Sequence, residues 1–261
     1  ALGERGYAVT LAERASQPGG RVTREAALPG LAAWARVRDW RLTQIARMAH
    51  VEMYLESNMG KDEILRFGAP HVVFATGATW RRDGVGHANH KTIPGAGRSH
   101  VFGPEDVMAG RIDKGPVLIF DDDHGYMAGV LAEKLVANGM EVMLVTPAAM
   151  VSEFTVLTLE QGFVQKRLLE LGVTIRQQVN LAAIEAGHAE LACVYTGRRE
   201  MVAATSIVLV TARVPNEQVY QALVRRPDLM EAAGLRSIAL IGDCLSPQTI
   251  AAAVYDGHSY A

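Results

Sequence analysis

Three apolar segments that lie far apart in the sequence each lead into residues suited to binding a ligand. Residues 8–13 (AVTLAE) precede a Pro-Gly-Gly-Arg run at 18–21, residues 71–77 read HVVFATG, and residues 238–243 read IALIGD. In a doubly wound α/β domain, the acid that ends the second strand binds an adenosine ribose, and a Gly-Asp pair after a late strand faces the rest of the ligand. The three segments therefore predict one nucleotide site in such a domain.

The glycine-rich turn that opens a dinucleotide-binding domain is not in the sequence. The pattern Gly-x-Gly-x-x-Gly would precede residues 8–13, but Ala1 stands only a few positions upstream of that strand. This turn normally joins the first strand to the first helix. We therefore expect the sequence to begin inside the first helix, with the first βα unit of the domain missing.

Composition is that of a soluble globular protein. The 261 residues are 49% hydrophobic and 21% charged, the net charge is −2, and no run of Lys or Arg stands out. We expect no nucleic-acid partner and no membrane partner, since both need basic patches or long apolar runs. Cys193 and Cys244 have no metal-like spacing, so we expect no metal site and a cytoplasmic location.

Hydrophobic periodicity predicts an α/β fold built from two Rossmann-like domains, the second inserted in the first. An ADP- or FAD-binding-like domain takes residues 1–113 plus 203–261, and an NAD(P)-binding-like domain takes residues 114–202. Strands are expected at 8–13, 51–56, 71–76, 116–121, 141–146, 206–211 and 238–241, with a meander at 173–177, 181–186, 190–195 and 200–204. Helices are expected at 31–50, 62–67, 104–109, 126–138, 156–171, 216–224 and 247–260, and a long loop at 14–30.

The first segment supplies four candidate ligand-binding residues. Glu13 stands where an acid would accept the ribose hydroxyls, although a solvated carboxylate at a strand end is the bland alternative. Gly19 and Gly20 follow, and their missing Cβ atoms would let the backbone approach a diphosphate. Arg21 adds a charge-assisted contact or, equally well, a surface ion pair.

The second and third segments supply four more candidates. Thr76 and Gly77 end an apolar strand, which many strands do simply because a turn is needed. Gly242 and Asp243 precede an expected helix that begins near Ser246, whose N-terminus would favour an anion. The alternative for Asp243 is a capped turn. We expect no catalytic residue in the chain, because the sequence shows no recognisable Ser/His/Asp or Cys/His set.

An acidic turn argues against a nicotinamide cofactor in the inserted domain. Asp121, Asp122 and Asp123, followed by His124, occupy the strand-to-helix turn where glycines would bind a pyrophosphate. Carboxylates would repel that group and cancel the field of the helix N-terminus. Thr146 stands where the ribose-binding acid would follow the next strand. We therefore interpret this domain as a dinucleotide fold without its dinucleotide, with helix capping by Asp122 or Asp123 as the simplest role for the acids.

Other polar residues give weaker signals. His87, His90 and His100 lie in or beside an irregular segment and are expected to be loop histidines. Trp34 and Trp40 share a helix with several arginines, which favours a core stripe with a solvated basic edge over a docking face.

Six short runs spread over nearly the whole sequence: residues 26–30 (AALPG), Trp34 with 38–41 (RDWR), 75–80 (ATGATW), 93–96 (IPGA), 131–135 (LAEKL) and 241–243 (IGD). Together they resemble the carboxy-terminal part of the trimethylamine dehydrogenase family. That family includes dimethylamine and histamine dehydrogenases and demethylases of methylated prolines.

The resemblance implies a larger parent enzyme. Its amino-terminal part would be a (β/α)₈ barrel with FMN, followed by a four-iron–four-sulfur cluster, and it would pack against the present chain. In the present chain, the site for ADP or FAD would be lined by Glu13, Gly20, Arg21, Thr76, Gly77 and Asp243. Electrons would pass to an electron-transferring flavoprotein, and a homo-oligomer is expected for the full-length enzyme.

Two other functions stay open at this point. One is part of an NAD(P)H-dependent flavin reductase of the dienoyl-CoA reductase type, a branch that binds NADPH in its second domain. The other is a non-catalytic nucleotide fold that serves as a scaffold.

Overall fold

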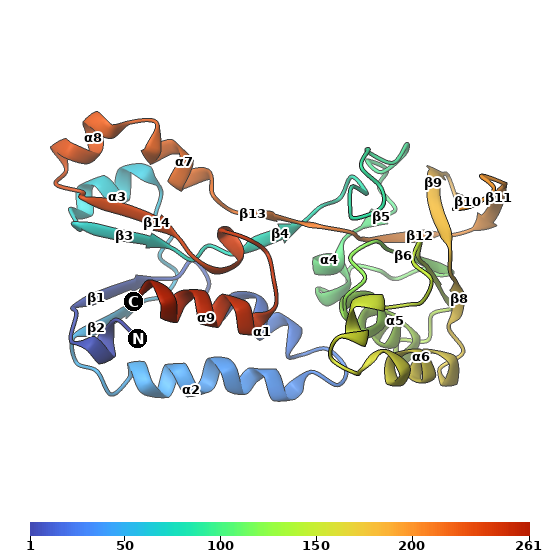
Figure 1. Cartoon of the computed structure of the whole chain (residues 1–261), viewed down its shortest axis with the longest axis horizontal. Helices are drawn as coiled ribbons and strands as arrows, with labels where there is room; N and C mark the ends of the chain where they lie inside the picture. Colours follow the sequence, from blue (N-terminus) through green and yellow to red (C-terminus); the bar gives the residue numbers. More distant parts are fainter. The chain divides into compact units, whose positions relative to one another are not determined.

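A computed structural model describes residues 1–261 and divides into two compact units (Figure 1). Unit 1 comprises residues 1–27, 31–79 and 214–261, and unit 2 comprises residues 28–30 and 80–213. The chain passes between the units at the short strands β4 (Ala78–Trp80) and β13 (Arg213–Pro215). The predicted boundaries between the ADP- or FAD-binding-like domain and the NAD(P)-binding-like domain, at 113/114 and 202/203, stay a prediction.

Unit 2 is built on a five-stranded parallel sheet in the order β5-β12-β6-β7-β8. The strands are β5 (Val101–Phe102), β12 (Ser206–Val210), β6 (Val117–Asp121), β7 (Val142–Val145) and β8 (Thr174–Arg176). Every residue of β6 and β12 is buried. Near-continuous apolar runs of this kind are typical of parallel strands covered on both faces.

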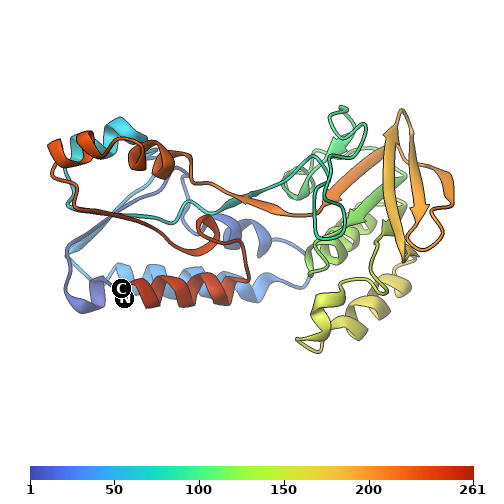
Figure 2. The same cartoon turned by 45° about the horizontal axis from the view of Figure 1, so that its top comes forward.

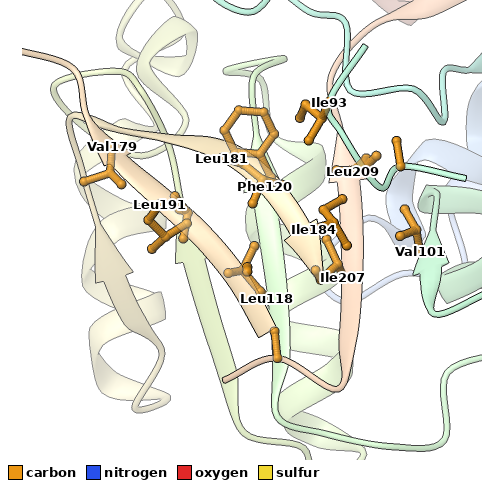
Figure 3. Packing of buried hydrophobic residues seen from close by; sticks show 14 residues of the cluster. Ile93, Val101, Leu118, Phe120, Val179, Leu181, Ile184, Leu191, Ile207 and Leu209 are labelled. Atoms are coloured by element: carbon orange, nitrogen blue, oxygen red, sulfur yellow. The ribbon is translucent and has the colours of Figure 1, made fainter. Parts of the chain in front are cut away.

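One face of this sheet packs against an antiparallel meander of β9 (Val179–Glu185), β10 (His188–Cys193) and β11 (Arg199–Ala203). Alternate residues of the central strands, Leu118 and Phe120 of β6 and Ile207 and Leu209 of β12, point toward it. They meet apolar side chains of the meander and Ile93 in one buried cluster (Figure 3). The expected strand at 173–177 does not belong to the meander; it pairs with β7 as the edge strand β8.

Helices accompany the same sheet: α4 (Pro104–Met108), α5 (Met127–Ala137) and α6 (Gln161–Glu170). Met127, Leu131 and Leu135 recur at the spacing of one helix face and are at most 1% exposed. The helix expected at 156–171 is interrupted. A 3-10 turn, η3 (Glu153–Val156), precedes α6, and Leu159 between them has a φ of 62°, which an α-helix cannot contain.

Unit 1 contains two separate parallel strand pairs. β1 (Val9–Ala12) pairs with β2 (Val51–Tyr54), and β3 (His71–Phe74) pairs with β14 (Ser237–Leu240). The apolar run at 8–13 favours a buried strand, but β1 alternates between half-buried and exposed residues. Its only strand partner is β2, so its other edge is not covered by a neighbouring strand.

Helices fill out unit 1: α1 (Gly20–Glu25), α2 (Ala35–Ile45), α3 (Lys61–Phe67), α7 (Gln218–Val224), α8 (Pro227–Ala232) and α9 (Ile250–Tyr260), with 3-10 turns η1 (Gly3–Arg5), η2 (Ala32–Trp34) and η4 (Gly242–Cys244). A small core joins Ile64, Phe74, Leu223, Leu235 and Cys244. Figures 1 and 2 both draw α9 beside α2, with the two termini close together, and the Arg5 side chain donates to the carbonyl of Ala261.

Two helix predictions in unit 1 need correction. The loop expected at 14–30 contains α1, which begins at Gly20, a residue that reads as loop because it is a glycine. The helix expected at 31–50 is shorter, and its apolar stripe does not reach a core: no residue of α2 is buried, and Trp40 is 53% exposed. None of the helices combines the length and the apolar composition that a membrane-spanning helix needs.

We predict that the meander-facing side of the sheet dominates the stability of unit 2. Phe120→Ala should lower the free energy of unfolding by about 3–5 kcal/mol, because the Phe120 side chain has no exposed area and its removal leaves a cavity in the core. Leu157→Ala, at a side chain that is 86% exposed, should change it by no more than about 0.5 kcal/mol. Urea unfolding followed by circular dichroism measures both. Equal effects would contradict this assignment of the core.

Candidate functional site

The structure joins the first and third predicted segments through one ion pair in unit 1. The guanidinium of Arg21, on α1, lies 2.5 Å from a carboxylate oxygen of Asp243, which follows β14. The same guanidinium donates to the carbonyl of Gln248 at 2.9 Å and pairs with Glu25 at 2.9 Å. Arg21 and Asp243 are 18% and 9% exposed, so the pair is largely removed from water. Partial burial strengthens the attraction relative to an exposed pair.

Two glycines shape the turn that delivers Arg21 to this pair. Gly19 and Gly20 have φ values of 102° and 49°, both in the left-handed region that favours glycine. A Cβ on Gly19 would lie 2.6 Å from Thr23 Oγ1 and 2.7 Å from a carbon of Arg38. A Cβ on Gly20 would meet nothing within 4 Å, so the space beside its backbone is open.

Asp256, on α9, fixes the Gly242 turn. Its carboxylate accepts the backbone N–H of Gly242 at 2.5 Å, and Gly242 has a φ of 63°. Asp243 in turn accepts the N–H of Gln248 at 3.0 Å. Asp243 therefore serves both the turn and the ion pair with Arg21. The helix after this turn begins later than predicted, at Ile250, where Thr249 caps it by accepting the N–H of Ala252.

Glu13 follows the end of β1 and stands apart from the Arg21–Asp243 pair. One oxygen of its half-buried carboxylate accepts the N–H of Ala15 at 2.8 Å, and its backbone bonds to Tyr54 and Ser57. The second oxygen has no hydrogen-bond partner in the structure, which leaves it available as an acceptor.

Thr76 and Gly77 bind Asn216, where the chain re-enters unit 1. The Thr76 hydroxyl donates to the carbonyl of Asn216 at 2.5 Å, and the Asn216 amide donates back to the carbonyl of Thr76 at 3.1 Å. Gly77 accepts the N–H of Asn216 at 2.9 Å and has a φ of 72°. The immediate role of this second segment is therefore to hold the strand end in place.

Helix capping was the predicted role of Asp122 in the acidic turn of unit 2, but Asp122 does not cap α5. The N-cap residue of α5 is Tyr126, which makes no side-chain cap bond. Asp122 has no exposed area and instead accepts the N–H groups of Ala88 and Asn89, each at 2.9 Å. His124 Nε2 lies 3.2 Å from the same carboxylate. Asp123 bonds to the backbone of Gly125, in the turn just before the helix.

Burial perturbs the titration of this turn. Asp121 accepts the N–H of His124 at 3.0 Å through one oxygen, while its other oxygen is buried with no hydrogen-bond partner. Burial and repulsion from Asp123 raise the pKa of Asp121 to about 7. Burial also raises the pKa of Asp123, although the nearby positive charge of Arg213 opposes that change.

His124 is held in this acidic surrounding with a φ of 59°. Burial acts to lower its pKa, but the hydrogen bond to Asp122 and the charges of Asp121, Asp122 and Glu153 outweigh that effect, so the pKa is raised. No group of three or more His, Cys, Asp or Glu side chains in the structure could hold a metal ion.

Sequence reasoning missed the residues that support each candidate. Asn216 and Asp256 are remote from the motif residues that they hold, whereas Glu25 stands one helical turn after Arg21 and Gln248 follows Asp243 by five residues. The spacing of four residues between Arg21 and Glu25 is the only sequence signal among them.

Comparison with known proteins shows that the chain is similar to part of several amine-oxidising enzymes. Residues 102–209 match the model of an "OYE-like second alpha/beta domain". The chain is 35% identical, over its whole length, to dimethylamine dehydrogenase from Hyphomicrobium sp. (strain x), of which it covers 39%. It thus spans about two fifths of this curated relative.

Solved structures agree. Histamine dehydrogenase from Rhizobium sp. 4-9 is similar with a TM-score of 0.96 and 43% identity, over 99% of this chain and 40% of that one. The 6-hydroxypseudooxynicotine amine oxidase of Pseudomonas geniculata N1 is similar with a TM-score of 0.95 and 40% identity, over 99% and 38%. The chain belongs to the trimethylamine dehydrogenase-like family of oxidoreductases and corresponds to part of the length of its members.

Proposed function

We propose that this chain is the nucleotide-binding part of a larger iron–sulfur flavoprotein that oxidises a small amine, with ADP or FAD held in unit 1. The observation that carries the proposal is the match of the entire chain to dimethylamine dehydrogenase and to the histamine dehydrogenase structure. Since the chain covers about 40% of those proteins, the amine site, FMN and a four-iron–four-sulfur cluster would belong to an amino-terminal barrel region.

The residues of unit 1 fit an adenosine diphosphate moiety. Glu13 has a carboxylate oxygen without a partner, which suits a ribose hydroxyl. The backbone beside Gly20 is open where a Cβ would stand, which suits close approach of a phosphate. Arg21, next to Gly20 in the chain, supplies a positive charge that is held in place by Asp243 and Glu25. Bound FAD would bring redox chemistry to this site, whereas bound ADP would bring none.

In this proposal, the residues of unit 1 bind and orient the nucleotide. Asp256 holds the Gly242 turn, and through it Asp243, in a fixed position. The Arg21–Asp243 pair then holds α1 next to the turn after β14, so that the residues of these two segments keep their positions relative to each other. Such pre-organisation lowers the entropy that a ligand loses on binding.

Unit 2 is proposed to work without a nicotinamide cofactor. Its carboxylates Asp121 and Asp123 accept backbone N–H groups at the turn before α5, where a pyrophosphate would otherwise bind. Electrons would then leave through an electron-transferring flavoprotein, and the full-length enzyme would be a cytoplasmic homo-oligomer.

Replacing Glu13 tests the ribose contact. In the full-length protein, Glu13→Ala should weaken ADP binding by about 1–3 kcal/mol, because the ribose hydroxyls lose their acceptor. Isothermal titration calorimetry with ADP measures the change. Glu52→Ala is the matched control, since Glu52 lies opposite Thr10 on the adjacent strand and faces solvent. Equal affinities for both variants would remove Glu13 from the site, and no binding by the unmodified protein would favour the scaffold function.

The nicotinamide-free assignment has its own test. On mixing the full-length protein with NADH under anaerobic conditions, we expect no bleaching of the flavin absorbance on the millisecond-to-second scale, because unit 2 offers no free anion site. A small amine substrate, dimethylamine or histamine, serves as the positive control for flavin reduction. Rapid bleaching by NADH would instead support the flavin reductase function.

A further inference from the structure

Three segments of unit 2 meet around the side chain of Asp122. Residues 86–89 bring backbone N–H groups to its carboxylate, and the N–H of His87 donates to its carbonyl at 3.3 Å. His124 follows two residues later, and its carbonyl accepts the N–H of Phe154 at 3.0 Å. The rings of His87, His124 and Phe154 lie 5.3–5.8 Å apart, centre to centre.

This junction lies at the carboxyl edge of the parallel sheet. Val210 of β12 pairs with Asp121 at the end of β6, so the residues that follow these strands stand together. The N–H groups of Asp122 and Asp123 both donate to the carbonyl of Val210. This is the edge at which doubly wound domains bind their ligands. In unit 2, residues 86–89 lie against it.

Contact at this junction is too close for a side chain. A Cβ on Gly86 would lie 2.4 Å from an oxygen of Asp122. Asp122 and His124 are 0% and 6% exposed, although His87 and Ala88 on the outside are exposed. A thin, exposed segment is thus attached to a buried carboxylate and a buried imidazole.

We infer that residues 86–89 form a proton-controlled clasp, which the Asp122–His124 pair closes over the carboxyl edge of the unit 2 sheet and which opens as the pair loses its proton. A protonated His124 neutralises the buried Asp122 carboxylate while that carboxylate accepts the two clasp N–H groups. A neutral His124 leaves a buried negative charge uncompensated, and this cost falls on the contacts that hold the clasp.

The acidic groups around the junction favour a protonated His124, whereas the cations Arg213 and His87 act on Asp123. The acidic groups are Asp121, Asp122 and Glu153. His124 has a raised pKa, so its contribution is complete below the ordinary value of 6.5 and is lost as the pH rises through the folded value. The pKa of Asp121 is raised from 3.8 to about 7, so this group disfavours the folded form increasingly as the pH rises between these values. His124 therefore closes the clasp in mild acid and loosens it as the pH rises through its folded pKa, and the ionisation of Asp121 adds to that loosening up to about pH 7.

Hydrogen exchange at single amides tests the clasp in the intact protein. We expect the protection factors of the Ala88 and Asn89 amides, corrected for the intrinsic effect of pH, to fall on the order of tenfold between pH 6 and pH 8, because a neutral His124 no longer compensates the buried carboxylate that accepts these N–H groups. Amides of Ile119 and Leu209, in the central strands, should keep their protection over the same range.

Two variants identify the proton. His124→Asn removes the titrating ring, and Asn tolerates the left-handed backbone at this position. We expect it to abolish most of the pH dependence at Ala88 and Asn89. His188→Asn, at an exposed histidine of the meander, should keep the full dependence.

Three outcomes would overturn the clasp: protection that does not change with pH, a pH response that persists in His124→Asn, or a response lost equally in His188→Asn. Should His124→Asn fail to fold, nuclear magnetic resonance of the His124 ring in the unmodified protein decides the question. A ring titration whose midpoint coincides with the loss of protection supports the clasp, and a midpoint elsewhere overturns it.

Discussion

The central strands of unit 2 end at buried residues, Asp121 and Asp122 among them, and this constraint governs the turn after β6. Every residue of β6 and β12 is buried, so the backbone groups just beyond them must find partners within the protein. The turn after β6 supplies those partners from its own side chains: Asp121 serves the N–H of His124, and Asp122 serves the clasp. The first role of these acidic residues is therefore to accept hydrogen bonds from backbone N–H groups.

Unit 1 meets the same requirement differently. Its strands are half-buried, and β1 is paired on one side only. Glu13 keeps an oxygen without a partner, and the backbone beside Gly20 stays open. The residues that are paired, Arg21 and Asp243, hold each other rather than closing the site. The two units thus show how burial decides whether the carboxyl edge of a strand is available to a ligand or already satisfied.

The sequence allowed the prediction of most elements, because apolar runs and glycine stops mark them directly. The strands β6, β7 and β12 and the helix α5 lie within two residues of their predicted bounds. The errors arise where local pattern and tertiary contact disagree. Gly20 begins a helix, although a glycine in a sequence usually indicates a loop. Leu159 adopts a left-handed φ, a conformation that a leucine in a sequence does not indicate. The stripe on α2 shows helical spacing, yet burial depends on what packs against it.

Sequence could predict the motif residues of the candidate site but not the partners that hold them. A Gly-Asp pair after a strand is legible, whereas the Asp256 that fixes it comes from a helix 14 residues later. Asp122 shows the limit most clearly. Helix capping was the simplest prediction for it because its position in the chain precedes a helix. Its actual partners, Ala88 and Asn89, are more than 30 residues away, and only the folded chain brings them together.

Binding an anion and satisfying the turn from within are mutually exclusive uses of the same helix end. The N-terminus of α5 carries about half a positive charge, which is shared among the few N–H groups that point out of it. Asp121 and Asp123 already accept from the turn residues His124 and Gly125. A pyrophosphate placed there would find negative charge where it needs donors, so a nicotinamide dinucleotide could bind only after the turn had been rebuilt. Under the proposed clasp, loosening would expose this edge while the acidic side chains stay in place, which is consistent with the proposal that unit 2 works without a nicotinamide cofactor.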